Sequence, residues 1–448
     1  MGISVQSLEQ REPDHGRIDE DDHEGSTPAF GGDHAIRPWS PIDSTSRGVR
    51  VDRAIGDRLW DADGTEYVDA SSLNAACGYG RQEVVAAATD QLGRLQSVDM
   101  SVHDHALASL LAQRLTAHLG PELSRVLFTN SGSEGIEAAC FIAASYYAHR
   151  GEPRTRVVTF ARGYHGSTVL ARSLSCLPPT AHWFGDPVRV SPVDIPGTDR
   201  EARDPAMTPH LLAAFADAIT SDPSDPPMAV LVEPLINVGG GVVLPAGLLR
   251  GLRELCDQHG VLLIIDEVFT GAGRTGRMFG FQHEDITPDI VVSSKGLSGG
   301  YAPIAAVAIT EGIYQSFAED PFIGGVRYGH TTSGHAVACA ASIAVLDVIE
   351  KEGLVENADV MGARLLSGIS AVADHPAVRD VRGLGMLVII EADSFDNAAA
   401  LVAHAREQRL LVRQQGSAVM VVPPLTTDAD GIDDIVARFG SALAALAR

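Results

Sequence analysis

The stretch VLLIIDEVFTGAGRTGRMFGFQHEDITPDIVVSSKGL, Val261–Leu297, determines the fold that the sequence predicts. Its apolar run Val261–Ile265 has the length and composition of a strand buried on both faces of a parallel sheet. Asp266 follows this run, and a second apolar run, Ile290–Val292, is soon followed by Lys295. Because ligands of open α/β sheets bind beyond the carboxyl ends of the strands, we expect Asp266 and Lys295 to face one crevice. An acid and a lysine in one crevice indicate Schiff-base chemistry.

Lysine is so rare in this chain that its position is informative. The chain has 34 lysine and arginine residues, of which only Lys295 and Lys351 are lysines. Lys351 lies in IEKEG, where a helix is expected to end, and is interpreted as a solvated surface residue. Arginine cannot lose its proton to become a nucleophile, whereas lysine can. Lys295 is therefore a candidate nucleophile, and the alternative is a chance lysine on a loop.

Length, charge and cysteine content narrow the class of protein. A chain of 448 residues exceeds one usual hydrophobic core and predicts two domains. The net charge of −24 argues against a nucleic-acid partner, because phosphate-binding surfaces are basic. The five cysteines are scattered without metal-ligand spacing, which predicts no metal site and a reducing, cytoplasmic location. No apolar run approaches the roughly 18 residues of a membrane span, and no signal peptide is recognisable, so we expect no membrane partner.

Strand-like and helical segments alternate along the middle of the chain. Strands are expected at Arg125–Asn130, Arg156–Phe160, Met228–Val232 and Ile304–Ile309, and helices at Ser133–Tyr147, His210–Thr220 and Pro245–Gln258. This alternation is typical of a mostly parallel α/β sheet with helices on both faces.

The two ends of the chain have different patterns. Alternating residues around Asp63-Gly64 predict a hairpin. From about His335 we expect a long helix and then a smaller α+β unit, with strands at Met386–Glu391 and Ala418–Val422 and helices at Asn397–Glu407 and from about Ile432.

Three motifs lie where a ligand would bind. TNSGSEG, Thr129–Gly135, lies at a strand-to-helix turn that favours a phosphate, although an ordinary helix cap explains it better when it is taken alone. GAGRTG, Gly271–Gly276, matches the dinucleotide pattern, but it does not follow its strand directly and no helix follows it, which argues against NAD. Tyr164, in GYHG after the strand Arg156–Phe160, is placed to stack on a flat cofactor ring, or only to pack in a turn.

The order of these motifs resembles that of the class III (omega-type) aminotransferases, which are pyridoxal phosphate enzymes of fold type I. The resemblance extends from about Pro38 to the end of the chain. It rests on TNSGSEG, YHGST (Tyr164–Thr168), EP with GGG (Glu233-Pro234 and Gly239–Gly241), DEVFTGAGRTG, PDI with SKGLSGGY (Pro288–Tyr301), GHTTSGH (Gly329–His335), VRGLGML (Val381–Leu387) and VPPL (Val422–Leu425). Each motif is weak alone, whereas their order and spacing together are specific.

The resemblance implies an α/β fold of two domains. A large domain with a mostly parallel sheet covered by helices would bind the cofactor, and a smaller α+β domain would follow it. The implied division is an N-terminal segment that joins the small domain (38–77), a large PLP-binding domain (78–330) and a small C-terminal domain (331–448). The polar, acidic composition of residues 1–37 predicts a disordered or surface tail before them.

The resemblance also assigns roles around pyridoxal 5'-phosphate. Lys295 would hold the cofactor as a Schiff base and move the substrate proton, and Asp266 would keep the pyridine nitrogen protonated, since a carboxylate beside a cation favours both charged forms. The remaining implied cofactor residues are Gly132 and Ser133 at the phosphate, Tyr164 and Val268 on the two faces of the ring, and Thr331, which would reach the phosphate of the neighbouring subunit in a homodimer.

Two residues are candidates for substrate binding. Arg413 aligns with an arginine that binds a substrate carboxylate in relatives, and its planar fork suits a carboxylate; the alternative is a surface arginine of the small domain. Trp39 lies where relatives place a pocket aromatic, although a core role is equally good. Ile236 and Thr332 depart from the common pattern near the ring, so no specific substrate is transferred.

The expected function is therefore PLP-dependent transamination. A primary amine or omega-amino compound would give its amino group to a keto acid or aldehyde with ping-pong kinetics. An epimerase or aminomutase on the same scaffold would share every cofactor residue and is the main alternative. An NAD-dependent oxidoreductase, resting on GAGRTG, and a catalytically inactive binding protein are weaker ones.

Overall fold

The computed structural model describes residues 35–40, 42 and 48–446. The chain forms two compact units, 1–49 and 50–448, and every helix and strand below belongs to the second. Most of the predicted acidic tail, 1–37, lies outside the described residues. No helix among the described residues is long and apolar enough to cross a bilayer.

A seven-stranded sheet with the order β4-β12-β11-β10-β7-β5-β6 is the centre of the second unit. All its strands run parallel except β12, which is antiparallel to both of its neighbours, β11 and β4. The strands are β4 (Arg125–Thr129), β5 (Arg156–Phe160), β6 (Val190–Val193), β7 (Pro227–Val232), β10 (Leu262–Glu267), β11 (Ile290–Ser293) and β12 (Ala305–Ile309). The prediction of a mostly parallel α/β sheet is confirmed.

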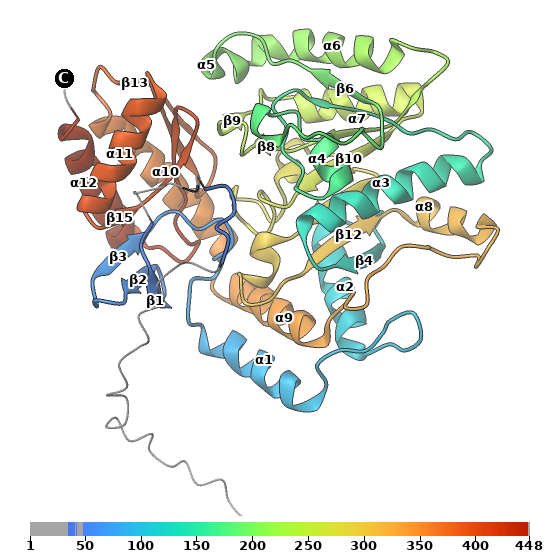
Figure 1. The fold of residues 1–448 in the computed structure, drawn as a ribbon, viewed down its shortest axis with the longest axis horizontal. Coiled ribbons are helices and arrows are strands. Elements are labelled where there is room, and N and C mark those ends of the chain that lie inside the picture. Colours follow the sequence, from blue (N-terminus) through green and yellow to red (C-terminus); the bar gives the residue numbers. More distant parts are fainter. Residues whose placement is uncertain (1–34, 41, 43–47, 447–448) are drawn as a thin grey trace, which may run out of the picture. The chain divides into compact units, whose positions relative to one another are not determined.

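The central strand β10 is apolar throughout because helices cover both of its faces. Ile264 packs in one cluster with helix α3, while Leu263 and Ile265 pack in the opposite cluster with helices α6 and α7. This alternation follows from the two-residue period of a strand. Figure 1 shows the helices in these layers. Their bounds are α3 (Gly132–His149), α6 (Thr208–Thr220) and α7 (Leu248–His259).

The register of the sheet brings the two predicted catalytic residues to one edge. Asp266 lies opposite Val292 and Glu267 opposite Ser293 on the parallel strand β11. Lys295 follows two residues later, at the start of a 3₁₀ turn. The carboxyl ends of β10 and β11 thus meet at the same edge, as expected.

A smaller sheet with the order β13-β14-β17-β16 follows in the C-terminal part. The predicted hairpin near Asp63-Gly64 is confirmed as β2 and β3, and β3 pairs in parallel with β15. The strands outside the seven-stranded sheet form three small sheets. They are β1 (Val51–Ile55), β2 (Arg58–Asp61), β3 (Glu66–Asp69), β8 (Leu235–Ile236), β9 (Val242–Val243), β13 (Val378–Gly383), β14 (Val388–Ala392), β15 (Leu410–Leu411), β16 (Arg413–Gln415) and β17 (Ala418–Val421).

The remaining helices include the long predicted helix, α9, which packs against α1 and α2 of the preceding part of the chain. They are α1 (Gln82–Arg94), α2 (Ala106–Leu119), α4 (Val169–Ser173), α5 (Asp199–Ala202), α8 (Glu311–Ser316), α9 (Ala336–Lys351), α10 (Leu354–Val372), α11 (Phe395–Glu407) and α12 (Ala429–Ala444). The division into domains at residues 77 and 330 stays a prediction.

Candidate active site

The side chain of Lys295 lies at the junction of two cavities. The first, of about 230 Å³, is lined by Lys295 and by five other predicted cofactor residues: Gly132, Ser133, Tyr164, Asp266 and Val268. The second, of about 440 Å³, is lined by Lys295 together with Arg413, Asp69 and Tyr79. The structure therefore places the lysine in one cavity with the predicted cofactor residues and in a second cavity with the predicted substrate arginine.

The backbone and the charge of Lys295 are both unusual. Its φ of 25° lies in the left-handed region, which is strained for a residue with a Cβ. Burial lowers the pKa of its amine, and repulsion from Arg413 lowers it further, while Asp266 and Glu233 act in the opposite direction. A lowered pKa increases the fraction of neutral amine, which is the nucleophilic form.

Asp266 is held by two neighbours, one at each carboxylate oxygen. It is only 5% exposed. Its Oδ1 accepts a hydrogen bond from the Val268 N–H at 3.0 Å, and its Oδ2 lies 2.8 Å from His165 Nδ1. His165 Nε2 lies 3.1 Å from the hydroxyl of Thr159 on β5. The carboxylate is thus oriented by His165, which in turn contacts Thr159 on β5, two strands away from β10 in the sheet.

Sequence reasoning missed His165 as a site residue. The signal was its place in GYHG, directly after β5 at the sheet edge where β10 delivers Asp266. A hydrogen-bonded histidine in a turn is one of two open interpretations of this motif, and its pairing with Asp266, 101 positions away, is visible only in the fold.

Glu233 connects two loops of the first cavity from inside. Its Oε1 accepts from the Tyr164 N–H at 3.0 Å and its Oε2 from the Asn237 N–H at 3.1 Å. Burial raises the pKa of this carboxyl to about 7; the charge of Asp266 adds to the rise and that of His165 opposes it. Glu233 is a second residue that sequence reasoning quoted only as part of a motif.

Two glycines keep the end of the first cavity open at the N-terminus of α3. A Cβ on Gly132 would lie 2.8 Å from both methyl groups of Val268, and a Cβ on Gly166 would lie 2.5 Å from the Ser133 hydroxyl. Ser133 Oγ accepts a hydrogen bond from the Ser167 N–H at 3.1 Å. A helix N-terminus offers unpaired N–H groups and partial positive charge, which suits an anion.

Thr331 does not line either cavity. Thr331 is exposed in the single chain, and its neighbour Thr332 donates to Asn130 Oδ1 at 2.9 Å. Trp39 belongs to the first compact unit and is 61% exposed. Their roles stay predictions.

The loop GAGRTG, Gly271–Gly276, is a structural loop. Its Arg274 is buried and donates to the carbonyl oxygens of Met386 and Pro423, at 3.0 and 2.6 Å. The next ordered element is the 3₁₀ turn Gly280–Glu284, so no helix opens at the last glycine. The loop lacks the geometry of a dinucleotide site.

Comparison with known proteins decides the family. The model of the family "Aminotransferase class-III" matches residues 41–443. The chain belongs to the class-III aminotransferase family. It is therefore a PLP-dependent transaminase of fold type I, and neither the isomerase nor the oxidoreductase alternative describes it better.

Class-III relatives cover almost the whole chain. The diaminobutyrate–2-oxoglutarate transaminase of Halomonas elongata is 34% identical over 430 residues, which are 90% of this chain and 91% of that protein. The taurine–pyruvate aminotransferase of Bilophila wadsworthia is 33% identical, over 86% of this chain and 90% of that protein. The structure of the omega transaminase from Pseudomonas jessenii in complex with PMP has a TM-score of 0.86 and 30% identity, and covers 92% of this chain and 96% of that chain.

The first cavity of this class-III aminotransferase fits pyridoxal phosphate. The helix N-terminus and the two glycines form a cradle that an added Cβ would fill, and Asp266 lies in the same cavity as Lys295. Asn237 Oδ1, which belongs to the cavity lining, is buried without a hydrogen-bond partner among the described residues. A polar ligand would satisfy this atom.

Proposed function

We propose that Lys295 and Asp266 are the catalytic residues of this transaminase and that Arg413 selects its substrates. The observation that carries the proposal is the position of Lys295, which lines the cofactor cavity and the Arg413 cavity at once. An amine that enters beside Arg413 would reach the lysine without crossing the cofactor site.

Pyridoxal phosphate, when bound, supplies an aldehyde that exchanges amines and a ring that stores electrons. The Lys295 amine would hold the cofactor in the resting enzyme. Its lowered pKa favours the neutral Nζ, which would accept a proton from the substrate carbon and act as the base and acid of the reaction. Asp266, aimed by His165, holds a proton at the pyridine nitrogen through charge attraction.

The other predicted cofactor residues have supporting positions. Gly132 and Ser133 bind the phosphate at the start of α3, and Tyr164 and Val268 lie against the two faces of the ring. Their common membership of one cavity supports these roles.

The donor is a primary amine or an omega-amino compound, and the acceptor is a keto acid or an aldehyde. Arg413 binds the carboxylate of those partners that have one. Its place beside Lys295 supports this role, and relatives are named for transfer to 2-oxoglutarate and pyruvate.

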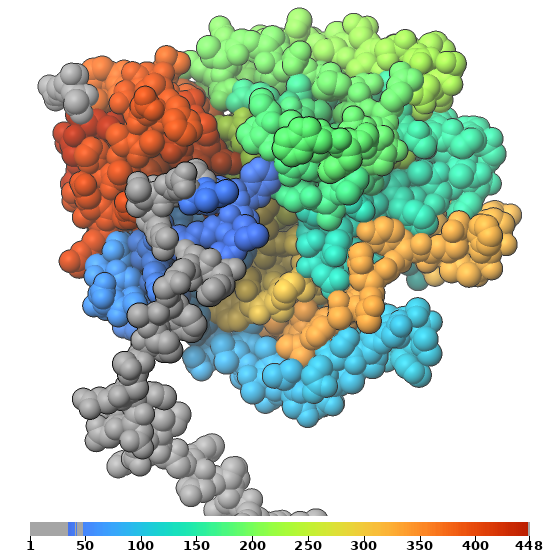
Figure 2. Space-filling model, viewed as in Figure 1, coloured from blue at the N-terminus to red at the C-terminus, as the bar shows by residue number. Residues whose placement is uncertain are grey.

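The enzyme acts as a homodimer in which Thr331 reaches the phosphate of the neighbouring site. Exposed apolar side chains support a second copy here, since Phe322 and Ile323 are 75% and 65% exposed. A cavity of about 800 Å³ lies between α2, α8 and residues 324–326, and the surface is notched between α8 and the α1–α2 connection (Figure 2).

The five unpaired cysteine thiols support a reducing, cytoplasmic location.

An acceptor comparison tests the substrate role. The aminated enzyme is mixed with pyruvate or with propanal, which lacks a carboxylate, and the single turnover is followed by cofactor absorbance. Arg413→Ala should weaken the binding of pyruvate on the order of 10- to 100-fold, since a charge-assisted bond of about 1.5–3 kcal/mol is lost. The binding of propanal should be nearly unchanged. An equal loss for both acceptors would refute the role of Arg413.

A further inference from the structure

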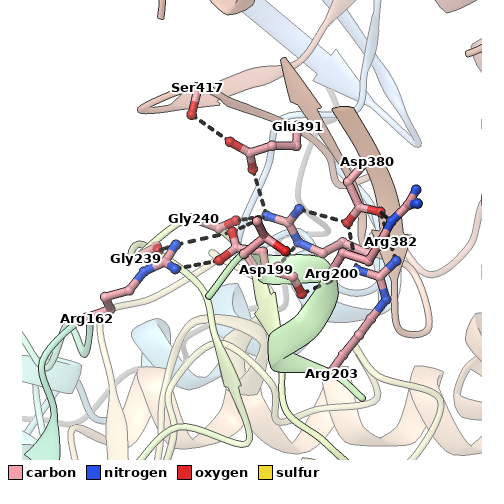
Figure 3. A network of polar contacts seen from close by, with 12 residues as sticks. Arg162, Asp199, Arg200, Arg203, Gly239, Gly240, Asp380, Arg382, Glu391 and Ser417 are labelled. Carbon is pink, nitrogen blue, oxygen red and sulfur yellow. Dashed lines mark hydrogen bonds and ion pairs between the residues drawn. The ribbon is translucent and has the colours of Figure 1, made fainter. Parts of the chain in front are cut away.

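A buried arginine outside the proposed chemistry, Arg382 on β13, is the centre of a polar network (Figure 3). Its side chain is fully buried. It donates to the carbonyl oxygens of Gly241 at 2.8 Å and Gly240 at 2.5 Å. It also contacts three carboxylates, those of Asp199 at 2.8 Å, Glu391 at 2.9 Å and Asp380 at 3.2 Å.

One branch of the network reaches the loop of Tyr164. Arg162, two residues before that tyrosine, donates to Gly239 O at 2.8 Å and to Asp199 Oδ1 at 2.5 Å. Asp199 therefore joins Arg162 to Arg382, as Figure 3 shows. The contact is close, because a Cβ on Gly239 would lie 2.1 Å from Arg162 O. This explains why Gly239, the first residue of the GGG motif, is a glycine.

The segments held by this branch form a wall of the cofactor cavity. Tyr164 follows Arg162, and Asn237 and Val238 precede Gly239; all three line the cavity. Glu233 joins the same two segments from inside, through the N–H groups of Tyr164 and Asn237. The wall is thus fixed from both sides.

The other branch reaches the hairpin that carries Arg413. Glu391 on β14 accepts a hydrogen bond from Ser417 Oγ at 2.6 Å, in the turn between β16 and β17. The Nε2 of Gln415, in the same hairpin, donates a hydrogen bond to Val238 O at 3.4 Å. Arg413 is the first residue of β16.

We propose that the Arg382 cluster, defined as Arg162, Asp199, Arg382, Glu391 and Ser417, positions the cofactor wall and Arg413 relative to each other. The cluster thereby sets the distance between the site of the cofactor ring and the site where Arg413 binds the substrate carboxylate. Replacing a buried ion pair by apolar residues is often neutral for stability, so the value of such a cluster lies in its directional bonds. These are positioning residues, and the inference rests on the proposed roles of Tyr164 and Arg413.

The test uses one mild substitution at each end of the cluster. Arg162→Met leaves Asp199 paired with Arg382, and Ser417→Ala leaves Glu391 paired with Arg382. Arg364→Met is the matched control, because Arg364 forms a two-bond pair with Asp433 on the exposed faces of α10 and α12. Thermal unfolding of each holoenzyme checks that all three variants fold.

The two variants should have different effects. Arg162→Met should raise the apparent Kd of the apoenzyme for pyridoxal phosphate about tenfold and change the visible circular dichroism of the bound ring, as expected when charge-assisted bonds to the wall are lost. Ser417→Ala should raise the apparent dissociation constant of pyruvate in the half-reaction by about three- to tenfold. The apparent dissociation constant of propanal and the limiting rate should stay unchanged. The control should match the wild type in every readout.

Wild-type values for Arg162→Met and Ser417→Ala would overturn the inference. An equal rise in the apparent dissociation constants of pyruvate and propanal in Ser417→Ala would also overturn it. Such a result would mean that the substitution disturbs the site as a whole and does not act through Arg413. If Arg413→Ala separates the two acceptors while Ser417→Ala does not, only the cluster fails. If Arg413→Ala itself does not separate them, the proposed function fails.

Discussion

Gly132 is the position where one added methyl group tests the cofactor cradle most sharply. A Cβ there would lie 2.8 Å from Cγ1 and from Cγ2 of Val268 and 3.5 Å from its Cβ, with no other atom among its three nearest contacts. Gly132 does not have a positive φ, so Gly132→Ala adds a clash without backbone strain. The clash therefore has a single, identifiable partner.

The cost should appear in cofactor binding more than in folding. In the apoenzyme, Val268 can move into the cavity that it lines. In the holoenzyme the ring occupies that space, so the overpacking cost of about 1–3 kcal/mol must be met. At 1.4 kcal/mol for each factor of ten, pyridoxal phosphate should bind about 5- to 150-fold more weakly to Gly132→Ala.

A double-mutant cycle isolates the contact. Val268→Ala removes both methyl groups that the new Cβ would meet, so the double variant should bind the cofactor nearly as well as Val268→Ala alone. The expected coupling is about 0.5–3 kcal/mol, measured by titrating each apoenzyme with pyridoxal phosphate. Gly93→Ala on α1, where a Cβ would meet no atom within 4 Å, is the control and should leave affinity unchanged. Additive losses in the double variant would refute the cradle geometry.

Two further outcomes follow from the buried acids. Asp266→Asn should retain the cofactor but slow the half-reaction on the order of 10²–10³-fold, since it removes a fixed charge at the site where charge develops; an unchanged rate in stopped-flow absorbance would contradict its role. Glu233 has a pKa of about 7 against a usual 4.5, so the folded state keeps its proton where the unfolded state has lost it. Its contribution to stability should fall by about 3 kcal/mol between pH 4.5 and 7 and stay level above. Glu233→Gln should flatten that part of the denaturation profile, and an unchanged slope would count against this titration.

Much of the sheet could be predicted because its strands are buried on both faces. Runs such as Val261–Ile265 leave no polar positions, and their alternation with helices indicates parallel strands. The direction of β12 was not predictable from such a run, since an antiparallel strand between two covered faces is equally apolar. The edge strand β6 was missed because Pro192 interrupts it; proline is tolerated there at the edge of a sheet.

Helix α10 was also omitted, although its buried residues recur every three or four positions. They include Leu354, Ala358, Leu365 and Ile369. The small residues Gly362 and Gly368 between them obscure the apolar face, because they allow close packing on Gly385 and Val436 instead of filling space.

In the candidate site, the residues found from the sequence are those whose chemistry is local to a motif. Lys295 stood out by residue type and Asp266 by its place after a strand. His165, Glu233 and Arg382 each contact a partner far away in the chain, which is Asp266, Tyr164 and Asp199 respectively. No pattern of spacing predicts such pairings before the fold is known.

The most direct test of the central claim is to find which amine carries the cofactor. The holoenzyme is reduced with borohydride, digested and analysed by peptide mass spectrometry, with only Lys295 and Lys351 as candidate lysines in the whole chain. Lys351 lies exposed at the end of α9 and serves as an internal control. We predict that the reduced pyridoxyl group is found on Lys295 alone. A label on Lys351, or none on either lysine, would contradict the account.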